Sequence, residues 1–366
     1  MHRRRFLATV GTLSALSLAG CQTSDDAGSG NESTIDGSAT STAPPTTSAP
    51  ASGKPDGIYV QTFQERMSMQ GMAEAGDYGF ALMFTVPHTF WTVTGNTVSK
   101  VERAPEDSIH QMASTWDAET RTALPETGLS VEINRDGSLV TEEVIYPMLS
   151  QPMGFHYGGN FTLDGDGTYT VELSVGATNT RRAGAFADRL NEPASAEIDL
   201  AFTDESRSEV SSQPIDQGGQ PGALRPMEMM STPKATAPSR EEVPGSVRGS
   251  ARSDDADFLV TVLDRPPAGV DGNGQYLAVS ARTRYNGYEL PAMALSGTVT
   301  RGSETLFDGP LTRTIHPELG YHYGAPVESV QSGDELALSV ETIPQVARHE
   351  GYETAFRQFE DVTVTL

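Results

Sequence analysis

Cysteine is almost absent from the sequence: Cys21 is the only one among the 366 residues. It ends an N-terminal apolar run, where export processing would consume its thiol. The rest of the chain then has no thiol group. This excludes disulfides, thiolate zinc sites, cysteine nucleophiles and a His-Cys blue-copper centre.

Positive charge is scarce as well. The chain has 25 Lys plus Arg residues against 49 Asp plus Glu, a formal net charge of −24. Binding to nucleic acid needs the opposite sign, so we expect no nucleic-acid partner. Self-repulsion on this scale is tolerable in concentrated salt, because the Debye length falls to about 3 Å at 1 M. The composition therefore predicts a halophilic, archaeal-type cell-surface protein whose acidity keeps it soluble.

Motifs for catalysis are missing too. The sequence has no Gly-x-Ser-x-Gly elbow, no phosphate-binding loop and no dinucleotide fingerprint. Carboxylates are abundant, but in so acidic a chain a pair of them carries no information about a reaction. We therefore expect that the protein is not an enzyme.

Residues 1–21 resemble a twin-arginine lipoprotein signal. Arg3 and Arg4 precede an apolar run that is too short to span a bilayer, which takes about 20 residues. Leu18-Ala19-Gly20-Cys21 resembles a lipobox, so we expect Cys21 to carry membrane lipid; a chance cysteine in an uncleaved signal anchor is the alternative. The protein is then exported and anchored to the outer face of the cell membrane.

The remaining chain predicts an all-β protein on a stalk. Residues 22–54 are rich in Ser, Thr and Pro and cannot bury enough apolar surface to offset the entropy of ordering, so they read as disordered. Beyond them, short β-branched or aromatic runs alternate with Gly-bearing turns, without a helical period. This favours two tandem immunoglobulin-like β-sandwich domains. The expected boundaries are residues 55–205 for domain 1, 206–248 for a linker and 249–366 for domain 2.

One short element occurs twice. His156-Tyr157-Gly158 and His322-Tyr323-Gly324 each precede a strand pattern. With the two histidines aligned, Arg181-Arg182 falls against Arg348-His349 after a one-residue slip, and Phe186 falls against Phe356. The repeat predicts two homologous domains that dock on each other, with a homodimer as the alternative assembly.

The segment "YPMLSQPMGFHYGGN…GDGTYTVELSV" is similar to the core of the periplasmic Fe2+-transport protein family. Pro147-Met148 and His156-Tyr157-Gly158 match its Met-Pro-Met…His-Tyr-Gly signature with one extra residue between them, and Arg348-His349 matches its Arg-His pair. The resemblance implies an exported immunoglobulin-like sandwich that is dimeric, binds copper or related divalent metals through Met and His, and supports iron uptake.

Several positions depart from that pattern. The family's early His-x-Glu pair is missing, and its positions are expected at Gly79 and Ala81 in one half and at Leu259 and Thr261 in the other. Arg182 stands where a His is expected, and Thr314 lies near the Met position. Neither half holds a full ligand set, so the site is either degenerate or assembled across the two domains.

Five residues are the candidate metal ligands: Met148, His156, His88, His322 and His349. A thioether with imidazoles suits copper better than Mg2+ or Ca2+, and the expected ion is copper or iron. His156 is expected at a turn. As the alternative, each histidine only hydrogen-bonds the backbone and fixes a turn.

Further methionines and histidines are less clear from sequence alone. Met67 to Met72 contains three thioethers that could complete the site, although methionine is also a common filler of cores. His316 could replace the methionine that the second half lacks. His110 has no partner that the sequence indicates.

Two functions remain open. The first is a lipid-anchored metal-binding protein in iron or copper uptake, delivering the ion to a membrane metal permease. The second is a structural or protein-interaction module of the cell surface that retains the family fold without its metal. The missing His-x-Glu pair favours the second function, whereas the repeated His-Tyr-Gly element, Met148 and His349 favour the first.

Overall fold

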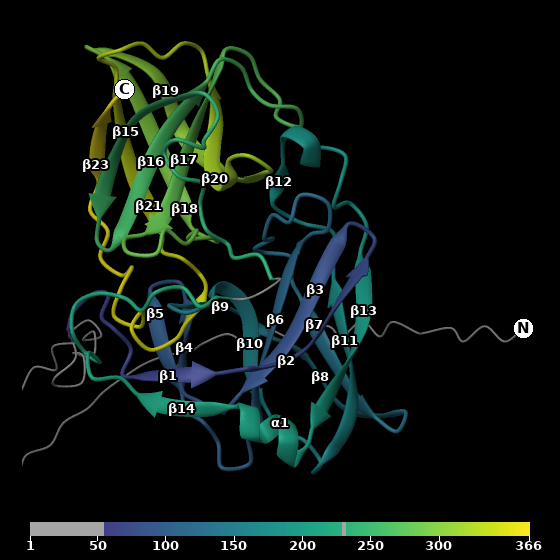
Figure 1. The fold of residues 1–366 in the computed structure, drawn as a ribbon. Helices are drawn as coiled ribbons and strands as arrows, with labels where there is room; N and C mark the ends of the chain where they lie inside the picture. The colour runs from purple at the N-terminus through teal and green to yellow at the C-terminus, as the bar shows by residue number, and fades with distance from the viewer. Residues whose placement is uncertain (1–54, 229–231) are drawn as a thin grey trace, which may run out of the picture. The chain divides into compact units, whose positions relative to one another are not determined.

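The computed structural model describes residues 55–228 and 232–366. The predicted signal, Cys21 and the predicted stalk lie outside these residues. The described chain is built almost entirely of strands, which confirms the all-β prediction (Figure 1). Its helical turns are η1 (Gly184–Phe186) and α1 (Asp204–Glu209). Within residues 55–228 and 232–366, no helix has the length and apolar character needed to cross a bilayer.

Residues 55–228, the first half, form a sandwich of two sheets whose strands are antiparallel apart from one short strand, β22, that the second half adds. The larger sheet has eight strands in the order β2 (Ser68–Ala75), β3 (Tyr78–Thr85), β6 (Ile109–Asp117), β10 (Gly154–Phe161), β9 (Tyr146–Ser150), β22 (Ala347–Arg348), β4 (Phe90–Thr94) and β5 (Thr97–Val101). The facing sheet has the order β13 (Ala194–Phe202), β11 (Gly167–Val175), β7 (Ser130–Arg135) and β8 (Ser138–Val144).

Alternating side chains explain how these sheets pack. Every second residue of β11 and β13 is buried, as expected for strands with one face on a core. The buried faces meet residues of β3, and the rings of Phe84 and Phe202 join the two layers edge to face. By contrast, β3 and β6 are buried on both faces. The second face of the larger sheet is therefore also covered.

Residues 232–366, the second half, contribute eight strands to an arrangement that folds back on itself. The strands follow the order β15 (Ser246–Ser253), β16 (Ala256–Leu263), β17 (Gln275–Thr283), β20 (Gly320–Val327), β19 (Glu304–His316), β18 (Ala294–Arg301), β21 (Glu335–Thr342) and β23 (Val362–Thr365). The long strand β19 pairs with β18 through its first part and with β20 through its last part. The first and last strands, β15 and β23, lie in contact.

The two halves exchange short strands. The two-residue strand β22 of the second half lies between β9 and β4 in the sheet of the first half. In return, β12 (Arg181–Arg182) of the first half pairs in parallel with β19 of the second. The predicted boundaries did not anticipate this exchange. Its consequence is that His349, which directly follows β22, lies on the large sheet of the first half.

The segment predicted as a linker, residues 206–248, is packed in its described part. It contains β14 (Ser211–Pro214), which pairs with β1 (Phe63–Arg66). Farther along, the Met227 N–H donates a hydrogen bond to the Pro152 carbonyl over 2.8 Å. Backbone pairing of this kind makes the segment part of the folded structure.

The two His-Tyr-Gly elements occupy the same place in the two halves. Met148 faces His156 across β9 and β10, and Thr314 faces His322 across β19 and β20. His156 therefore lies inside strand β10, and the prediction that it lies at a turn is wrong.

The same register corrects the alignment downstream. The Ala183 N–H donates to Ile315 O and the His349 N–H donates to Leu149 O, each over 3.0 Å. His349 therefore corresponds to Ala183, and Arg348 corresponds to Arg182. The Phe186 N–H donates to Ala183 O, and the Tyr352 N–H donates to His349 O. Since Ala183 and His349 correspond, Phe186 corresponds to Tyr352 instead of Phe356.

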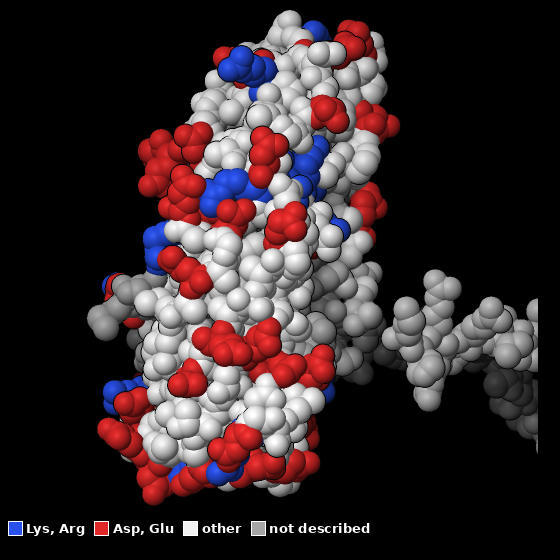
Figure 2. All heavy atoms as spheres, turned by 90° about the vertical axis from the view of Figure 1, so that its right-hand side faces the viewer, with Lys and Arg blue, Asp and Glu red and all other residues white. Residues whose placement is uncertain are grey.

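Acidic side chains cover much of the face drawn in Figure 2, with fewer Lys and Arg side chains among them. The negative charge predicted from the composition is thus carried at the surface, where solvent and salt can screen it.

Candidate metal centre

Four of the five predicted ligands lie together on the large sheet of the first half. They are His88, Met148, His156 and His349, and His110 joins them. We call these five residues the His/Met cluster. Ring centroids of His88 and His110 are 4.0 Å apart, and those of His156 and His349 are 5.0 Å apart.

Strand register explains three members of the cluster. On β10, His156, Gly158 and Asn160 alternate onto one face, because successive strand residues point to opposite faces. Met148 lies directly opposite His156 on β9, and His110 lies opposite Asn160 on β6. One patch of three neighbouring strands therefore places a thioether and two imidazoles side by side.

The other two members come from segments next to strands. His349 directly follows β22, and its backbone is fixed by the hydrogen bond to Leu149 O. Its ring lies between two cluster members: Nδ1 is 3.1 Å from His88 Nε2, and Nε2 is 3.3 Å from Met148 Sδ. His88 lies between β3 and β4. The cluster thus needs both halves, since only the second half provides His349.

Three imidazoles are held by the nitrogen that faces away from the centre of the cluster. His110 Nδ1 donates to Asn160 Oδ1 over 2.8 Å, and His156 Nδ1 donates to Gly154 O over 3.1 Å. His88 Nδ1 donates to Val86 O over 3.2 Å, and a carboxylate oxygen of Glu65 lies 3.0 Å from the same nitrogen. Fixing Nδ1 in this way sets the ring orientation and leaves the Nε2 lone pairs of His110 and His156 available to a metal ion, which is the usual arrangement behind a metal-ligating histidine.

The cluster is buried, and the imidazoles of His110, His156 and His349 are uncharged. Met148, His110 and His156 are fully buried. Burial lowers the pKa of His156 to about 4, with His88 as a further cause. Burial also holds the pKa of His110 and of His349 well below the ordinary value, with neighbouring imidazoles adding to the effect. These three rings are neutral at pH 7, the form in which imidazole coordinates a metal.

Two buried nitrogens in the cluster lack a hydrogen-bond partner. They are Nε2 of His110 and Nε2 of His156. A Cβ atom at Gly158 would lie 3.0 Å from His110 Nε2 and 3.1 Å from Met148 Sδ, so the glycine leaves a small space open in front of these atoms. Buried polar atoms are normally paired, and unpaired ones next to a space with a thioether fit a metal ion of the copper or late-transition type.

The positions expected for the family's His-x-Glu pair are closed. Trp116 fills the space above Gly79, so that a Cβ atom there would overlap the indole ring. Ala81 lies in an apolar cluster with Met83, Met112 and Trp116. The carboxylate of Glu65, on the different strand β1, lies 3.0 Å from His88 Nδ1.

His322, the fifth predicted ligand, does not join the cluster. Its Nε2 pairs with the Tyr276 hydroxyl over 2.9 Å, and its Nδ1 donates to Gly320 O over 3.1 Å. The Arg181 guanidinium donates to that same hydroxyl and to Thr314 Oγ1, each over 2.9 Å. A guanidinium supplied by β12 of the first half and a phenol thus lie in the second-half sheet where the first-half sheet holds a thioether and an imidazole.

The other residues considered from sequence lie elsewhere. Met69 and Met72 are 48% and 49% exposed, so they do not complete the cluster, and only Met67 points to the neighbourhood of His349. His316 accepts hydrogen bonds at Nδ1 from the Glu318 and Leu319 N–H groups. His316 therefore stabilises the turn that contains Glu318 and Leu319, and it does not replace the missing methionine.

Sequence reasoning missed His110, Asn160 and Glu65. The amide of Asn160 joins two parts of the cluster, because Oδ1 accepts from His110 and Nδ2 donates to His88 O over 2.9 Å. Asn160 stands four residues after His156 on the same face of one strand, and this period-two spacing was a usable signal. The contacts of Glu65 and His110 with His88 depend on tertiary packing.

Comparison with known proteins agrees with the resemblance over part of the chain. The model of the Fe2+ transport protein family matches residues 109–202, and that of a domain of unknown function, DUF7350, matches residues 241–365. The first match contains His110, Met148 and His156. It does not reach the second half, so the homology of the two halves stays a prediction. A comparison with curated proteins finds no match.

Two solved structures of FetP from uropathogenic Escherichia coli strain F11 are also similar. A copper-bound variant is 14% identical, covers 38% of this chain and 98% of its own, and has a TM-score of 0.28. The protein as isolated, expressed in the periplasm of E. coli, is 15% identical over 38% and 97% of the two chains, with a TM-score of 0.29. Strands β6, β9 and β10, which carry three members of the His/Met cluster, lie within the residues 109–202 that the Fe2+ transport protein family model matches.

Proposed function

We propose that the protein is an exported metal-binding protein that holds a copper or iron ion in the His/Met cluster and takes part in uptake of that metal. The observation that carries the proposal is the common orientation of the imidazoles. His110 and His156 are anchored through Nδ1 and present unpaired, buried Nε2 atoms beside Met148 Sδ. A buried histidine that only stabilises a fold would use both nitrogens, as His322 does.

The donor set favours copper over hard cations. One thioether and neutral imidazoles match copper in either oxidation state, and imidazole also suits iron. Met148, His88, His110, His156 and His349 would supply the ligand atoms. Asn160 and Glu65 would keep His110 and His88 in the coordinating orientation.

Export, anchoring and delivery complete the proposal. The lipobox-like run ending at Cys21 supports a lipid anchor on the outer face of the membrane, and the match of residues 109–202 supports a role in metal uptake. The partner we propose is a membrane metal permease that receives the ion. A cell-surface module without metal is the alternative, and it predicts no binding at the His/Met cluster.

Metal titration of purified full-length protein tests the proposal. Cu(II) and Fe(II) affinities are measured for the wild type, His156→Ala and Met148→Leu. Loss of one of these ligands should weaken binding by about tenfold or more.

His322→Ala is the matched control. His322 occupies the same strand position in the second half, is equally buried, and also donates from Nδ1 to the carbonyl two residues earlier. Its loss should leave metal affinity unchanged. Equal affinities in all four proteins, or no binding by the wild type, would contradict the proposal.

A further inference from the structure

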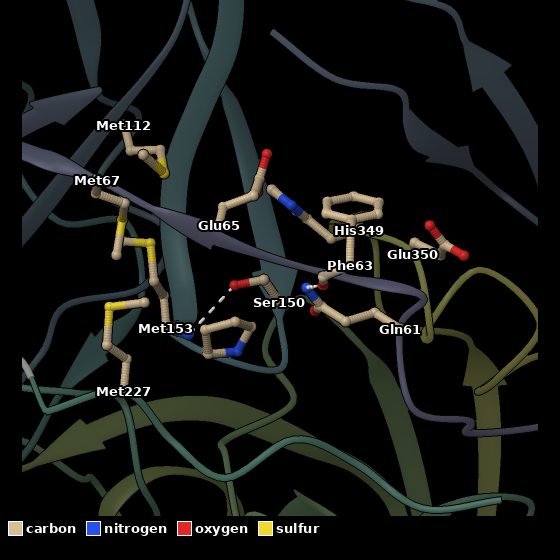
Figure 3. A pocket seen from close by; sticks show the side chains of 11 residues that line it. Gln61, Phe63, Glu65, Met67, Met112, Ser150, Met153, Met227, His349 and Glu350 are labelled. Carbon is tan, nitrogen blue, oxygen red and sulfur yellow. Dashed lines mark hydrogen bonds between the residues drawn. The ribbon is translucent and has the colours of Figure 1, made fainter. Parts of the chain in front are cut away.

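A small pocket lined by methionines adjoins the His/Met cluster. Four methionines share its wall: Met67, Met112, Met153 and Met227. We call it the thioether pocket. Figure 3 shows their side chains gathered on one side, with Glu65 and His349 on the other side of the same space. His349 thus borders both the pocket and the His/Met cluster.

The pocket and the cluster occupy consecutive positions on the same strand faces. On β6, Met112 is two residues after His110, and on β9, Ser150 is two residues after Met148. Residues two apart on a strand point to the same side, so each strand carries one cluster residue and then one pocket residue. The pocket is therefore continuous with the cluster along the sheet.

The N-terminal strand closes the pocket from outside. Phe63, Glu65 and Met67 are half-buried, whereas the intervening Gln64 and Arg66 are exposed. Alternate side chains from Phe63 to Met67 therefore point into the pocket. Met112 and Met153 are almost fully buried behind them.

Size and chemistry limit what the pocket can hold. Its cavity volume is about 20 Å3, close to the roughly 10–15 Å3 that one water molecule needs. An organic chelate would not fit, whereas a single ion would. Protein cores contain few spaces of this size, so a space shared by four thioethers and a carboxylate is unusual for methionines that only fill a core. Thioethers are soft ligands that prefer Cu(I) to iron, zinc or hard cations.

We propose that the thioether pocket binds monovalent copper and passes it to the His/Met cluster through His349. The binding step stands by itself, and the transfer step rests on the proposed function. The pocket would thus make Cu(I) the form of the metal that the protein receives.

Anaerobic titration with Cu(I), in competition with a chromophoric chelator, measures the pocket directly. The triple variant Met67→Leu/Met112→Leu/Met153→Leu removes three sulfur atoms at nearly constant volume. The matched control is Met69→Leu/Met72→Leu, which changes exposed methionines of the adjoining β2 strand. Thermal unfolding of both variants verifies that they fold.

The wild type and the control should bind one more equivalent of Cu(I) than of Cu(II). The triple variant should lose this extra equivalent, keep its Cu(II) affinity, and load Cu(I) into the cluster about tenfold more slowly. Unchanged Cu(I) stoichiometry and loading rate in the triple variant would overturn the proposal.

A second variant separates this inference from the proposed function. In His110→Ala/Met148→Leu the cluster is impaired and loses its own sulfur atom, but the thioether pocket is intact. Ag(I), a redox-inert probe, should still bind there with sulfur as the main neighbour in X-ray absorption. Ag(I) binding without sulfur neighbours would overturn the pocket assignment even if the cluster proves to bind copper. Sulfur-bound Ag(I) would support the pocket even if the cluster binds no metal.

Discussion

Arg181 Nε donates a hydrogen bond to Thr314 Oγ1 over 2.9 Å, at the place in the second half that corresponds to Met148 in the first. The same guanidinium donates to the Tyr276 hydroxyl and to Gly324 O. Tyr276 corresponds to His110, since each lies on the strand next to the His-Tyr-Gly strand in the same register. The Arg181 guanidinium thus binds both Thr314 and Tyr276, the residues that replace Met148 and His110 in the second half.

Replacing Arg181 with Ala should lower the free energy of unfolding by about 2 kcal/mol, because three hydrogen bonds from one charged group are lost. Metal affinity should not change, since the His/Met cluster belongs to the other sheet. Denaturant unfolding and copper titration of the same preparation measure both quantities. A variant that loses copper binding while its stability is unaltered would show that Arg181 belongs to the metal site.

Gly158→Ala should weaken metal binding by about tenfold, equal to about 1.4 kcal/mol. The added methyl group would lie 3.0 Å from His110 Nε2 and 3.1 Å from Met148 Sδ, in the space where these donors converge. Gly159→Ala is the control, because its Cβ would meet only Phe161, at 3.4 Å or more. Isothermal titration with Cu(II) compares them, and equal affinities would mean that the ion does not lie in front of Gly158.

Glu289→Gln should change how stability depends on pH. Burial raises the pKa of Glu289 to about 7, and hydrogen bonding from the Tyr321 N–H only partly opposes this. A raised carboxyl pKa means that the folded state favours the protonated form. The contribution of Glu289 to the free energy of unfolding is therefore complete below pH 4.5, the pKa of this carboxyl in the unfolded chain. It is lost as the pH rises to about 7, the pKa in the folded protein.

The difference between the two pKa values corresponds to about 3 kcal/mol. Relative to the wild type, Glu289→Gln should thus gain stability progressively between pH 4.5 and pH 7. Urea unfolding at several pH values tests this, with the exposed Glu328→Gln as the reference. Parallel curves for the wild type and Glu289→Gln would show that Glu289 is ionised normally.

Cys21→Ser should release the protein from the membrane. Stable anchoring needs two acyl or ether chains, and a lipidated Cys21 would carry them. Fractionation of cells that express the wild type or the variant measures the distribution between membrane and medium. Continued membrane association of Cys21→Ser would point to an uncleaved signal anchor or a protein partner.

Local sequence patterns predicted the fold class and one pair of cluster residues. Alternating runs with Gly-bearing turns gave the strands, because such runs can bury one face of a sheet. Met148 and His156 flank a short turn in which Gly154 has a φ of 73°, so that strands β9 and β10 pair as neighbours. A contact across such a short hairpin can be inferred from sequence.

The remaining contacts depend on pairing between distant segments. His349 reaches Met148 only because the two-residue strand β22 enters the sheet beside β9, and so short a strand has no sequence pattern of its own. The Arg residues of the repeat suggested an alignment shifted by one residue, which placed His349 opposite Arg182 instead of Ala183. Backbone hydrogen bonds, which the side chains do not reveal, set the actual register.

The histidine and the tyrosine of the repeated His-Tyr-Gly element have different roles, which sequence alone could not distinguish. Tyr157 accepts a hydrogen bond from the Thr127 N–H, and Tyr323 accepts one from the Met293 N–H, so both tyrosines tie a loop to the sheet. The tyrosine is structural in both halves. Only the first copy's histidine has an unpaired nitrogen, which is why the motif predicted two candidate ligands where the structure supports one.

Because β22 belongs to the same polypeptide, the set of metal-ligand atoms in the His/Met cluster does not depend on protein concentration. A site completed by a separate subunit would come apart on dilution, whereas a tethered segment meets its site at an effective concentration of the order of millimolar. Here the polypeptide itself connects His349 to the sheet that holds Met148. A sparsely distributed molecule could therefore keep its full set of donors without finding a second copy.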